Sequence, residues 1–146
     1  ATLARLAGIR NIVGVKEASG NIGQIAKVIH ECPAGFAVLS GDDALTIPLM
    51  ALGGTGIISV VSNEIPSEMA QLAAACLAGD YATARRLQKR FLPLMEVNFV
   101  ESNPMPVKWA MARMGLLKPN YRLPMLPPSA PAQAKIENVL KESGLI

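Results

Sequence analysis

Short apolar runs rich in β-branched residues recur in the first part of the chain. They span residues 11–15, 36–40 and 56–61, and each is almost continuously hydrophobic. Such runs are typical of strands that are buried on both faces, as in a parallel sheet covered by helices. We therefore predict three parallel strands.

The segments between these runs place apolar residues at helical spacing instead. This spacing predicts one helix over 22–29 and a second helix that runs to Leu52. Asp42 or Asp43 is well placed to cap the second helix, and Pro48 is expected to kink it. The alternation of strand and helix predicts an α/β fold.

From residue 66 onward the pattern is helical only. It predicts helices near 66–78, 80–99, 104–115 and 131–143, and the chain also starts in a helix-like segment at Ala1. A three-stranded parallel sheet leaves two apolar edges without a neighbour. A complete (β/α)₈ barrel needs about 250 residues, so the strand–helix units are interpreted as a piece of a larger sheet or barrel.

Composition narrows the class of protein. With 51% hydrophobic and 17% charged residues, the chain is not intrinsically disordered. No apolar run reaches the roughly 18–20 residues of a membrane-spanning helix. A membrane is therefore not an expected partner. The net charge is +3, but the basic residues are not interleaved with aromatic residues, so nucleic acid is not an expected partner either. The first residues lack the apolar core of a signal peptide, which makes the cytosol the expected compartment.

The chain has two cysteines and one histidine. Cys32 and Cys76 are too few for a disulfide framework and have no metal-ligand spacing, so we expect buried or idle thiols. A single histidine, His30, argues against a Ser-His-Asp triad and against a multi-histidine metal site. No metal site is therefore expected.

Lys16 is the main candidate for chemistry. It ends the first predicted strand, where barrel enzymes place catalytic groups. Gly14 shares its face and is expected to leave space beside it, and the apolar run is expected to desolvate it partly. Desolvation favours the neutral amine, which a Schiff-base nucleophile requires. The alternative is a lysine that reaches solvent and pairs with Glu17.

Two further motifs have ordinary structural explanations. The segment Ser40–Asp43 (SGDD) could hold a metal ion or act as paired carboxylates, but helix capping beside a tight turn is the favoured interpretation. The segment Gly53–Gly56 (GGTG) loosely resembles a phosphate-binding loop, but it precedes a strand rather than opening a helix.

In combination these motifs resemble those of the dihydrodipicolinate synthase family. Residues 13–21 (VGVKEASGN) resemble the family's Schiff-base lysine motif, 40–43 (SGDD) its next strand end, and 53–60 (GGTGIISV) its last barrel strand. Residues 101–110 (ESNPMPVKWA) and 122–125 (RLPM) resemble its helical tail. The resemblance covers essentially all 146 residues in the family's order.

The resemblance implies the C-terminal part of a TIM (β/α)₈ barrel, with about three parallel strands and their helices followed by a helical tail. Residues 1–65 would form the partial barrel that carries the lysine, and 66–146 the last barrel helix and the tail. It also implies a pyruvate-dependent class I lyase of lysine and diaminopimelate biosynthesis. Lys16 would form a Schiff base with pyruvate, and the enamine would add to aspartate semialdehyde. The Ile58 backbone would lie beside the pyruvate, Gly41 would line the pocket, and no metal or organic cofactor would be needed.

The same resemblance indicates which groups are not found here. The family's proton-shuttling tyrosines, its hydroxyl residues for the pyruvate carboxylate and its arginine for the aldehyde belong to the first half of the barrel and have no match. We therefore expect a truncated half that is inactive alone and that associates with the missing N-terminal half or a second copy, in a homo-oligomer. The alternatives are a non-catalytic barrel remnant or folding fragment, and a sibling lyase acting on N-acetylneuraminate or a 2-keto-3-deoxy sugar acid.

Overall fold

The computed structural model describes residues 2–146, which form two compact units. The first unit extends to Ser59 and includes Gln71–Arg85, and the second comprises Val60–Ala70 and Arg86–Ile146. Two helices, α4 (Pro66–Leu77) and α5 (Tyr81–Val97), contribute residues to both units. The α/β fold class is confirmed as three parallel strands with helices, and the described residues form no closed barrel.

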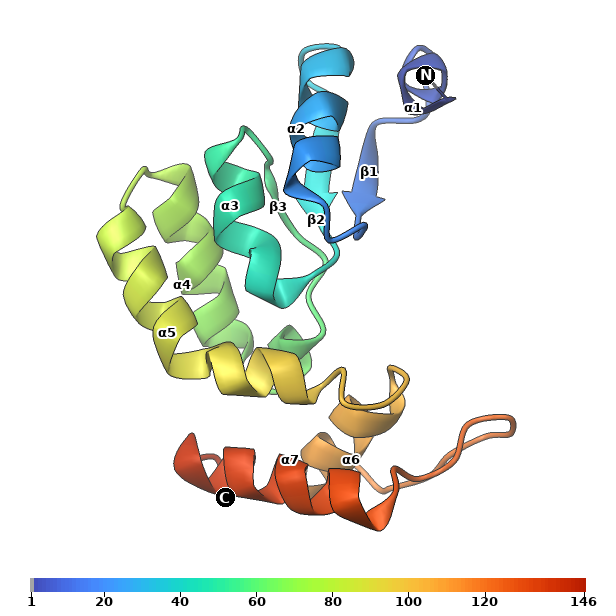
Figure 1. Ribbon diagram of the computed structural model, residues 1–146, viewed down its shortest axis with the longest axis vertical. Coiled ribbons are helices and arrows are strands. Elements are labelled where there is room, and N and C mark those ends of the chain that lie inside the picture. Colours follow the sequence, from blue (N-terminus) through green and yellow to red (C-terminus); the bar gives the residue numbers. More distant parts are fainter. Residues whose placement is uncertain (1) are drawn as a thin grey trace. The chain divides into compact units, whose positions relative to one another are not determined.

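The first unit contains a parallel sheet in the order β1-β2-β3. Its strands are β1 (Gly14–Glu17), β2 (Ala37–Ser40) and β3 (Gly56–Ile57). Because β2 lies between the other two, β1 and β3 each have one edge without a neighbouring strand in the described chain (Figure 1).

Helices cover one face of this sheet. In Figure 1, α2 (Ile22–Glu31) and α3 (Thr46–Ala51) lie in front of the strands, and α3 packs against α2, β2 and β3. The Asn21 side chain caps α2 by accepting a hydrogen bond from the Gln24 backbone at 3.0 Å. The short helix α1 (Thr2–Ala7) precedes β1 and packs on α2, as the helix-like start predicts, whereas Ala1 lies outside the described residues.

The strands are shorter than the hydrophobic runs that predict them. β1 begins only at Gly14, because the Ile12 backbone N–H turns back to the Ile9 carbonyl at 2.9 Å. β3 ends at Ile57 although the apolar run continues to Val61, which lies instead in a short 3₁₀ helix, η2 (Val61–Asn63). In both segments the backbone pairs over only part of the apolar run, and the run does not mark burial throughout, since Val13 is 73% exposed whereas Val61 is buried.

The expected kink at Pro48 is also wrong. The predicted helix after β2 is instead divided into a 3₁₀ turn, η1 (Asp43–Leu45), and α3, which begins at Thr46. Pro48 then lies in the first turn of α3, where a backbone N–H would have no partner within the helix.

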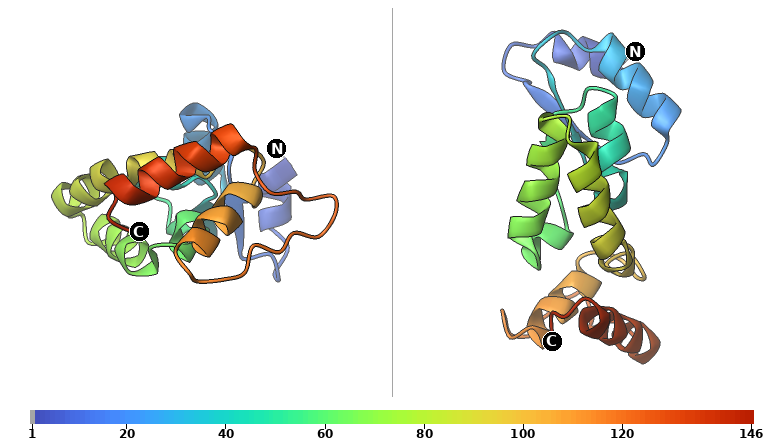
Figure 2. Two further views of the ribbon diagram at one scale, coloured as in Figure 1. Left: turned by 90° about the horizontal axis from the view of Figure 1, so that it is seen from below. Right: turned by 90° about the vertical axis from the view of Figure 1, so that its left-hand side faces the viewer.

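The second unit is helical. Besides η2 and its parts of α4 and α5, it contains α6 (Met105–Arg113) and α7 (Ala130–Glu142), which lie side by side (Figure 2). All four helices predicted after residue 66 are present within a few residues of their expected bounds. No helix among residues 2–146 combines the length and apolar character needed to cross a membrane.

Candidate active site

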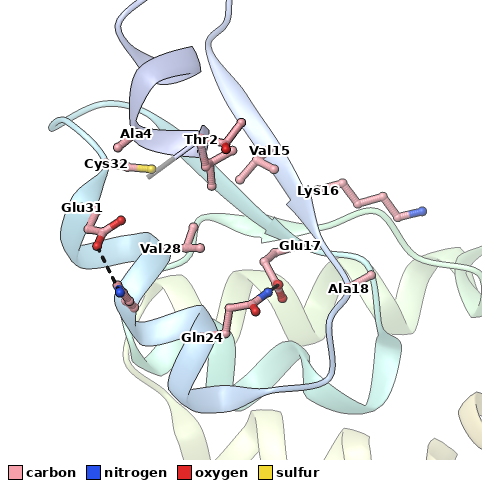
Figure 3. A pocket seen from close by; sticks show the side chains of 12 residues that line it. Thr2, Ala4, Val15, Lys16, Glu17, Ala18, Gln24, Val28, Glu31 and Cys32 are labelled. Carbon is pink, nitrogen blue, oxygen red and sulfur yellow. Dashed lines mark hydrogen bonds and ion pairs between the residues drawn. The ribbon is translucent and has the colours of Figure 1, made fainter.

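Lys16 extends from the uncovered face of the sheet. It is exposed, and Figure 3 shows its side chain directed away from Glu17 and Gln24. Within residues 2–146 its ammonium group makes no hydrogen bond and no ion pair. The strand therefore presents a free amine one residue before its carboxyl end.

Glu17 occupies the opposite face and is buried, with 7% of its surface exposed. Its carboxylate accepts hydrogen bonds from the Ser19 backbone N–H at 3.3 Å and from Gln24 Nε2 at 3.2 Å. Adjacent residues of a strand point to opposite faces, so Glu17 is not the ion-pair partner of Lys16. The alternative of a Lys16–Glu17 pair is therefore wrong.

Two expectations about the surroundings of Lys16 need correction. Lys16 is not desolvated in this chain, because no described element covers its face of the sheet. Gly14 does not make room for Lys16 either: a Cβ at Gly14 would lie 2.7 Å from the Ala37 carbonyl oxygen and 2.9 Å from the Ala37 Cβ. Gly14 is required by the close approach of β2 to β1.

Gly41 is the glycine that makes room for the lysine. A Cβ at this position would lie 2.7 Å from Lys16 Cε, 3.0 Å from Lys16 Cγ and 2.8 Å from Ala18 Cβ. The Lys16 stem therefore passes directly over the Gly41 backbone, which is itself held by a 2.7 Å hydrogen bond from its N–H to the Glu17 carbonyl. Gly41 and Lys16 are therefore neighbours.

Ile58 follows β3 directly and continues the same face. The register pairs Lys16 with Leu39 and Leu39 with Gly56, so the positions two residues later, including Gly41 and Ile58, project from that face too. The Ile58 N–H donates to the Ser40 carbonyl at 2.8 Å. Its carbonyl accepts no hydrogen bond from any described residue. A free backbone acceptor therefore lies at the same edge as Lys16.

The two aspartates after β2 have different roles. Asp42 caps η1 by accepting a hydrogen bond from the Ala44 backbone N–H at 2.9 Å, as the favoured interpretation predicts. Asp43 is 1% exposed, and its carboxylate accepts a hydrogen bond from the Ser59 hydroxyl. Sequence reasoning did not find this second contact. The sequence did contain a hint of it: capping uses only one of the two consecutive aspartates, so the other one was available for a different contact.

The glycine-rich segment before β3 serves packing. A Cβ at Gly54 would overlap the Leu49 side chain and would lie 3.1 Å from the Val38 carbonyl oxygen. Its backbone N–H donates to the Leu49 carbonyl at 3.0 Å. The glycine thus allows the chain to pass closely between α3 and β2, which accounts for the motif without a bound phosphate.

A cavity of about 470 Å³ lies between α1, β1 and α2 (Figure 3). Glu17, Gln24, Glu31 and Cys32 are among the residues that line it. Burial, and secondarily the negative charge of Glu31, raises the pKa of the Cys32 thiol, and burial alone raises the pKa of Cys76. Both cysteines are free, and their raised pKa values keep them protonated and poorly nucleophilic.

The described chain holds no cluster of three or more His, Cys, Asp or Glu side chains suited to a metal ion. The chemically distinctive features of the first unit are therefore the free Lys16 amine, the Gly41 backbone beneath it and the free Ile58 carbonyl. They lie at the carboxyl ends of three neighbouring parallel strands, which is the edge at which barrel enzymes build active sites.

Comparison with known proteins identifies the family of the chain. The model of the dihydrodipicolinate synthetase family matches residues 1–143. The chain belongs to this family. A curated relative, the 4-hydroxy-tetrahydrodipicolinate synthase of Koribacter versatilis, is 53% identical over 146 residues, which are 100% of this chain and 49% of the relative.

Solved structures of family members superpose closely on the chain. The dihydrodipicolinate synthase of Thermotoga maritima gives a TM-score of 0.95 at 42% identity, over 99% of this chain and 50% of that one. The enzyme from Acinetobacter baumannii, solved in complex with pyruvate, gives 0.95 at 40% identity with the same coverage. The chain thus spans about half the length of the relatives that it matches.

The buried Glu17 carboxylate generates a stability prediction. Glu17→Gln keeps the shape of the side chain but replaces the charged carboxylate and puts an NH₂ group in place of an oxygen that accepts from the Ser19 backbone N–H, so we expect the free energy of unfolding to fall by about 1–3 kcal/mol. Urea denaturation of the chain measures this loss.

The matched control is Glu31→Gln, which breaks the exposed Lys27–Glu31 pair at 3.7 Å. Pairs of this kind contribute about 0–1 kcal/mol, so its effect should be much smaller. Equal losses for the two variants would contradict the structural role assigned to Glu17.

Proposed function

We propose that the chain supplies the nucleophilic half of a 4-hydroxy-tetrahydrodipicolinate synthase, which condenses pyruvate with aspartate semialdehyde. The observation that carries this proposal is the unpaired Lys16 amine at the carboxyl end of β1, with its stem over Gly41. The curated name of the Koribacter versatilis relative supports the reaction, and the pyruvate complex of the Acinetobacter baumannii enzyme supports the first substrate.

The reaction begins with the neutral Lys16 amine. Its lone pair attacks the C2 carbonyl of pyruvate to give a carbinolamine, which loses the former carbonyl oxygen as water and forms an imine. Loss of a proton from C3 converts the imine into an enamine. C3 then forms a carbon–carbon bond to the aldehyde carbon of aspartate semialdehyde, whose oxygen takes up a proton. Attack of the acceptor's own amine on the imine carbon closes the ring and releases Lys16.

Gly41 and Ile58 serve this sequence through their backbones. With no side chain at Gly41, the Lys16 stem lies flat against the sheet and its amine reaches the edge. The Ile58 carbonyl accepts a hydrogen bond from the hydroxyl of the carbinolamine at the same edge. The imine itself withdraws electrons from C3, so these steps need no metal or organic cofactor.

The remaining groups must come from another polypeptide segment. Acid–base catalysis contributes roughly 10²–10⁴-fold to such reactions, and within residues 2–146 no element covers the exposed face around Lys16 to supply it. The partner is the complementary half of the barrel, which would pair with the open edges of β1 and β3. Val13 and Ile58, which are 73% and 46% exposed, are apolar surface for that contact.

The assembled enzyme is a homo-oligomer in the cytoplasm, a reducing compartment that suits two free cysteines.

Lys16 should be the residue that forms the imine. We define the completed barrel as this chain co-expressed with the segment of the Koribacter versatilis relative that it does not match. Incubation with pyruvate and borohydride should add one reduced pyruvyl group to the peptide that contains Lys16, as measured by peptide mass spectrometry. Lys16→Ala should abolish this label.

Lys27→Ala is the matched control, because Lys27 is exposed and, among residues 2–146, forms an ion pair with Glu31 alone. It should leave labelling of Lys16 unchanged. Gly41→Ala should weaken labelling, since the new methyl group occupies the path of the lysine stem. A label confined to Lys27 or another lysine would remove the proposed mechanism.

The acceptor should be aspartate semialdehyde. The completed barrel is assayed for condensation of pyruvate with aspartate semialdehyde and, in parallel, for cleavage of N-acetylneuraminate and of 2-keto-3-deoxygluconate. Condensation should be faster than either cleavage. Faster cleavage of a sugar acid would assign the chain to a sibling lyase, and imine formation without any turnover would support a non-catalytic remnant.

The isolated 146-residue chain should lack significant synthase turnover and should associate. Both its acid–base groups and its substrate positioning are incomplete, and positioning alone accounts for as much as about 7–11 kcal/mol in well-oriented reactions. A coupled synthase assay and light scattering on the purified chain test the two parts. A monomer at high micromolar concentration with normal turnover would contradict this prediction, whereas slow imine trapping would not.

A further inference from the structure

The carboxyl end of β3 has little support from the sheet. The strand consists of Gly56 and Ile57 only, and it pairs on one side, with β2. Beyond it, one backbone hydrogen bond, from the Ile58 N–H to the Ser40 carbonyl at 2.8 Å, continues the ladder. The Ile58 carbonyl thus lies where the regular pairing stops, and its position depends on contacts made by the next residue.

That next residue is attached to the loop after β2. The Ser59 hydroxyl donates a hydrogen bond to the carboxylate of Asp43, whose side chain is 1% exposed. A hydrogen bond to an ionised carboxylate is shorter and stronger than one between neutral groups, and burial increases its strength further. The pair fastens the end of β3 immediately after Ile58.

The loop that carries Asp43 is itself firmly held. Ser40, which is 1% exposed, donates its hydroxyl to the Asp42 carbonyl at 2.7 Å. Thr46, which is fully buried, donates its hydroxyl to the Asp43 carbonyl at 2.8 Å. Together with the Asp42 cap, these contacts give the Asp43 carboxylate a fixed position relative to β2 and hence to Gly41.

We propose that Asp43 and Ser59 are positioning residues, which hold the Ile58 carbonyl at the distance from Lys16 that binding of pyruvate requires. This inference rests on the proposed function. Neither side chain touches the substrate; the Asp43–Ser59 bond acts through the Ile58 peptide. Losing it should therefore weaken pyruvate binding more than it slows the chemical step on bound pyruvate.

The experiment uses the completed barrel and measures Lys16 labelling by borohydride at a series of pyruvate concentrations. Ser59→Ala and Asp43→Asn should raise the pyruvate concentration for half-maximal labelling by about 10-fold, which corresponds to one lost hydrogen bond. The labelling rate at saturating pyruvate should change much less. Ser59→Thr retains the hydroxyl and should restore the wild-type value. If Asp43→Asn does not fold, the comparison of Ser59→Ala with Ser59→Thr tests the positioning role instead.

Ser129→Ala is the matched control, because it removes a serine hydroxyl that caps α7, outside the loop that carries Asp43. It should lower the thermal midpoint yet leave the half-maximal pyruvate concentration unchanged. Amide hydrogen exchange of Ile58 gives a second readout, independent of activity. It should accelerate in Ser59→Ala and not in Ser129→Ala.

The outcomes separate the two proposals. If Lys16 is labelled but Ser59→Ala and Asp43→Asn leave the half-maximal concentration unchanged, the positioning role is wrong and the proposed function stands. An equal shift in Ser129→Ala would show a non-specific effect of lost stability, which also overturns the positioning role. If the unmodified enzyme is not labelled on Lys16, both proposals fail.

Discussion

Burial of the Glu17 carboxylate is the interaction on which the placement of Lys16 depends. The side-chain period of a strand is two residues, so a register shift of one residue would exchange the faces of Lys16 and Glu17. The hydrogen bonds from the Ser19 backbone and from Gln24 bind the carboxylate on the helix-covered face. Because these hydrogen bonds hold the Glu17 carboxylate on that face, Lys16 projects from the opposite face, where its amine is free.

The parallel register then brings distant parts of the chain to one edge. β1 pairs with β2 from Gly14 to Glu17, and β2 pairs with β3 through Leu39 and Ser40. Because all three strands run in the same direction, Lys16, Gly41 and Ile58 meet at their carboxyl ends. Close packing maintains this arrangement, since neither Gly14 nor Gly41 has space for a methyl group.

Hydrophobic periodicity predicts the helices and the position of Lys16 in β1, but it does not predict which side chains contact one another. The helices after residue 66 follow an amphipathic pattern that survives folding, and they lie close to their predicted bounds. Ile12 and Val61 are as hydrophobic as the strand residues near them, so hydrophobicity alone could not show that both lie outside the strands. The Asp43–Ser59 contact joins residues sixteen positions apart, which no local pattern encodes.

The error about desolvation has a physical consequence for the chemistry. A lysine must lose its proton to attack a carbonyl, and burial is the main means by which proteins favour the neutral amine. Lys16 is exposed because its face of the sheet is uncovered, and Ile58 on the same face is exposed with it. A segment that covers Ile58 would remove water from Lys16 at the same time. In the proposed enzyme, closure of the barrel and activation of the nucleophile would therefore be one event, driven by the same apolar contact.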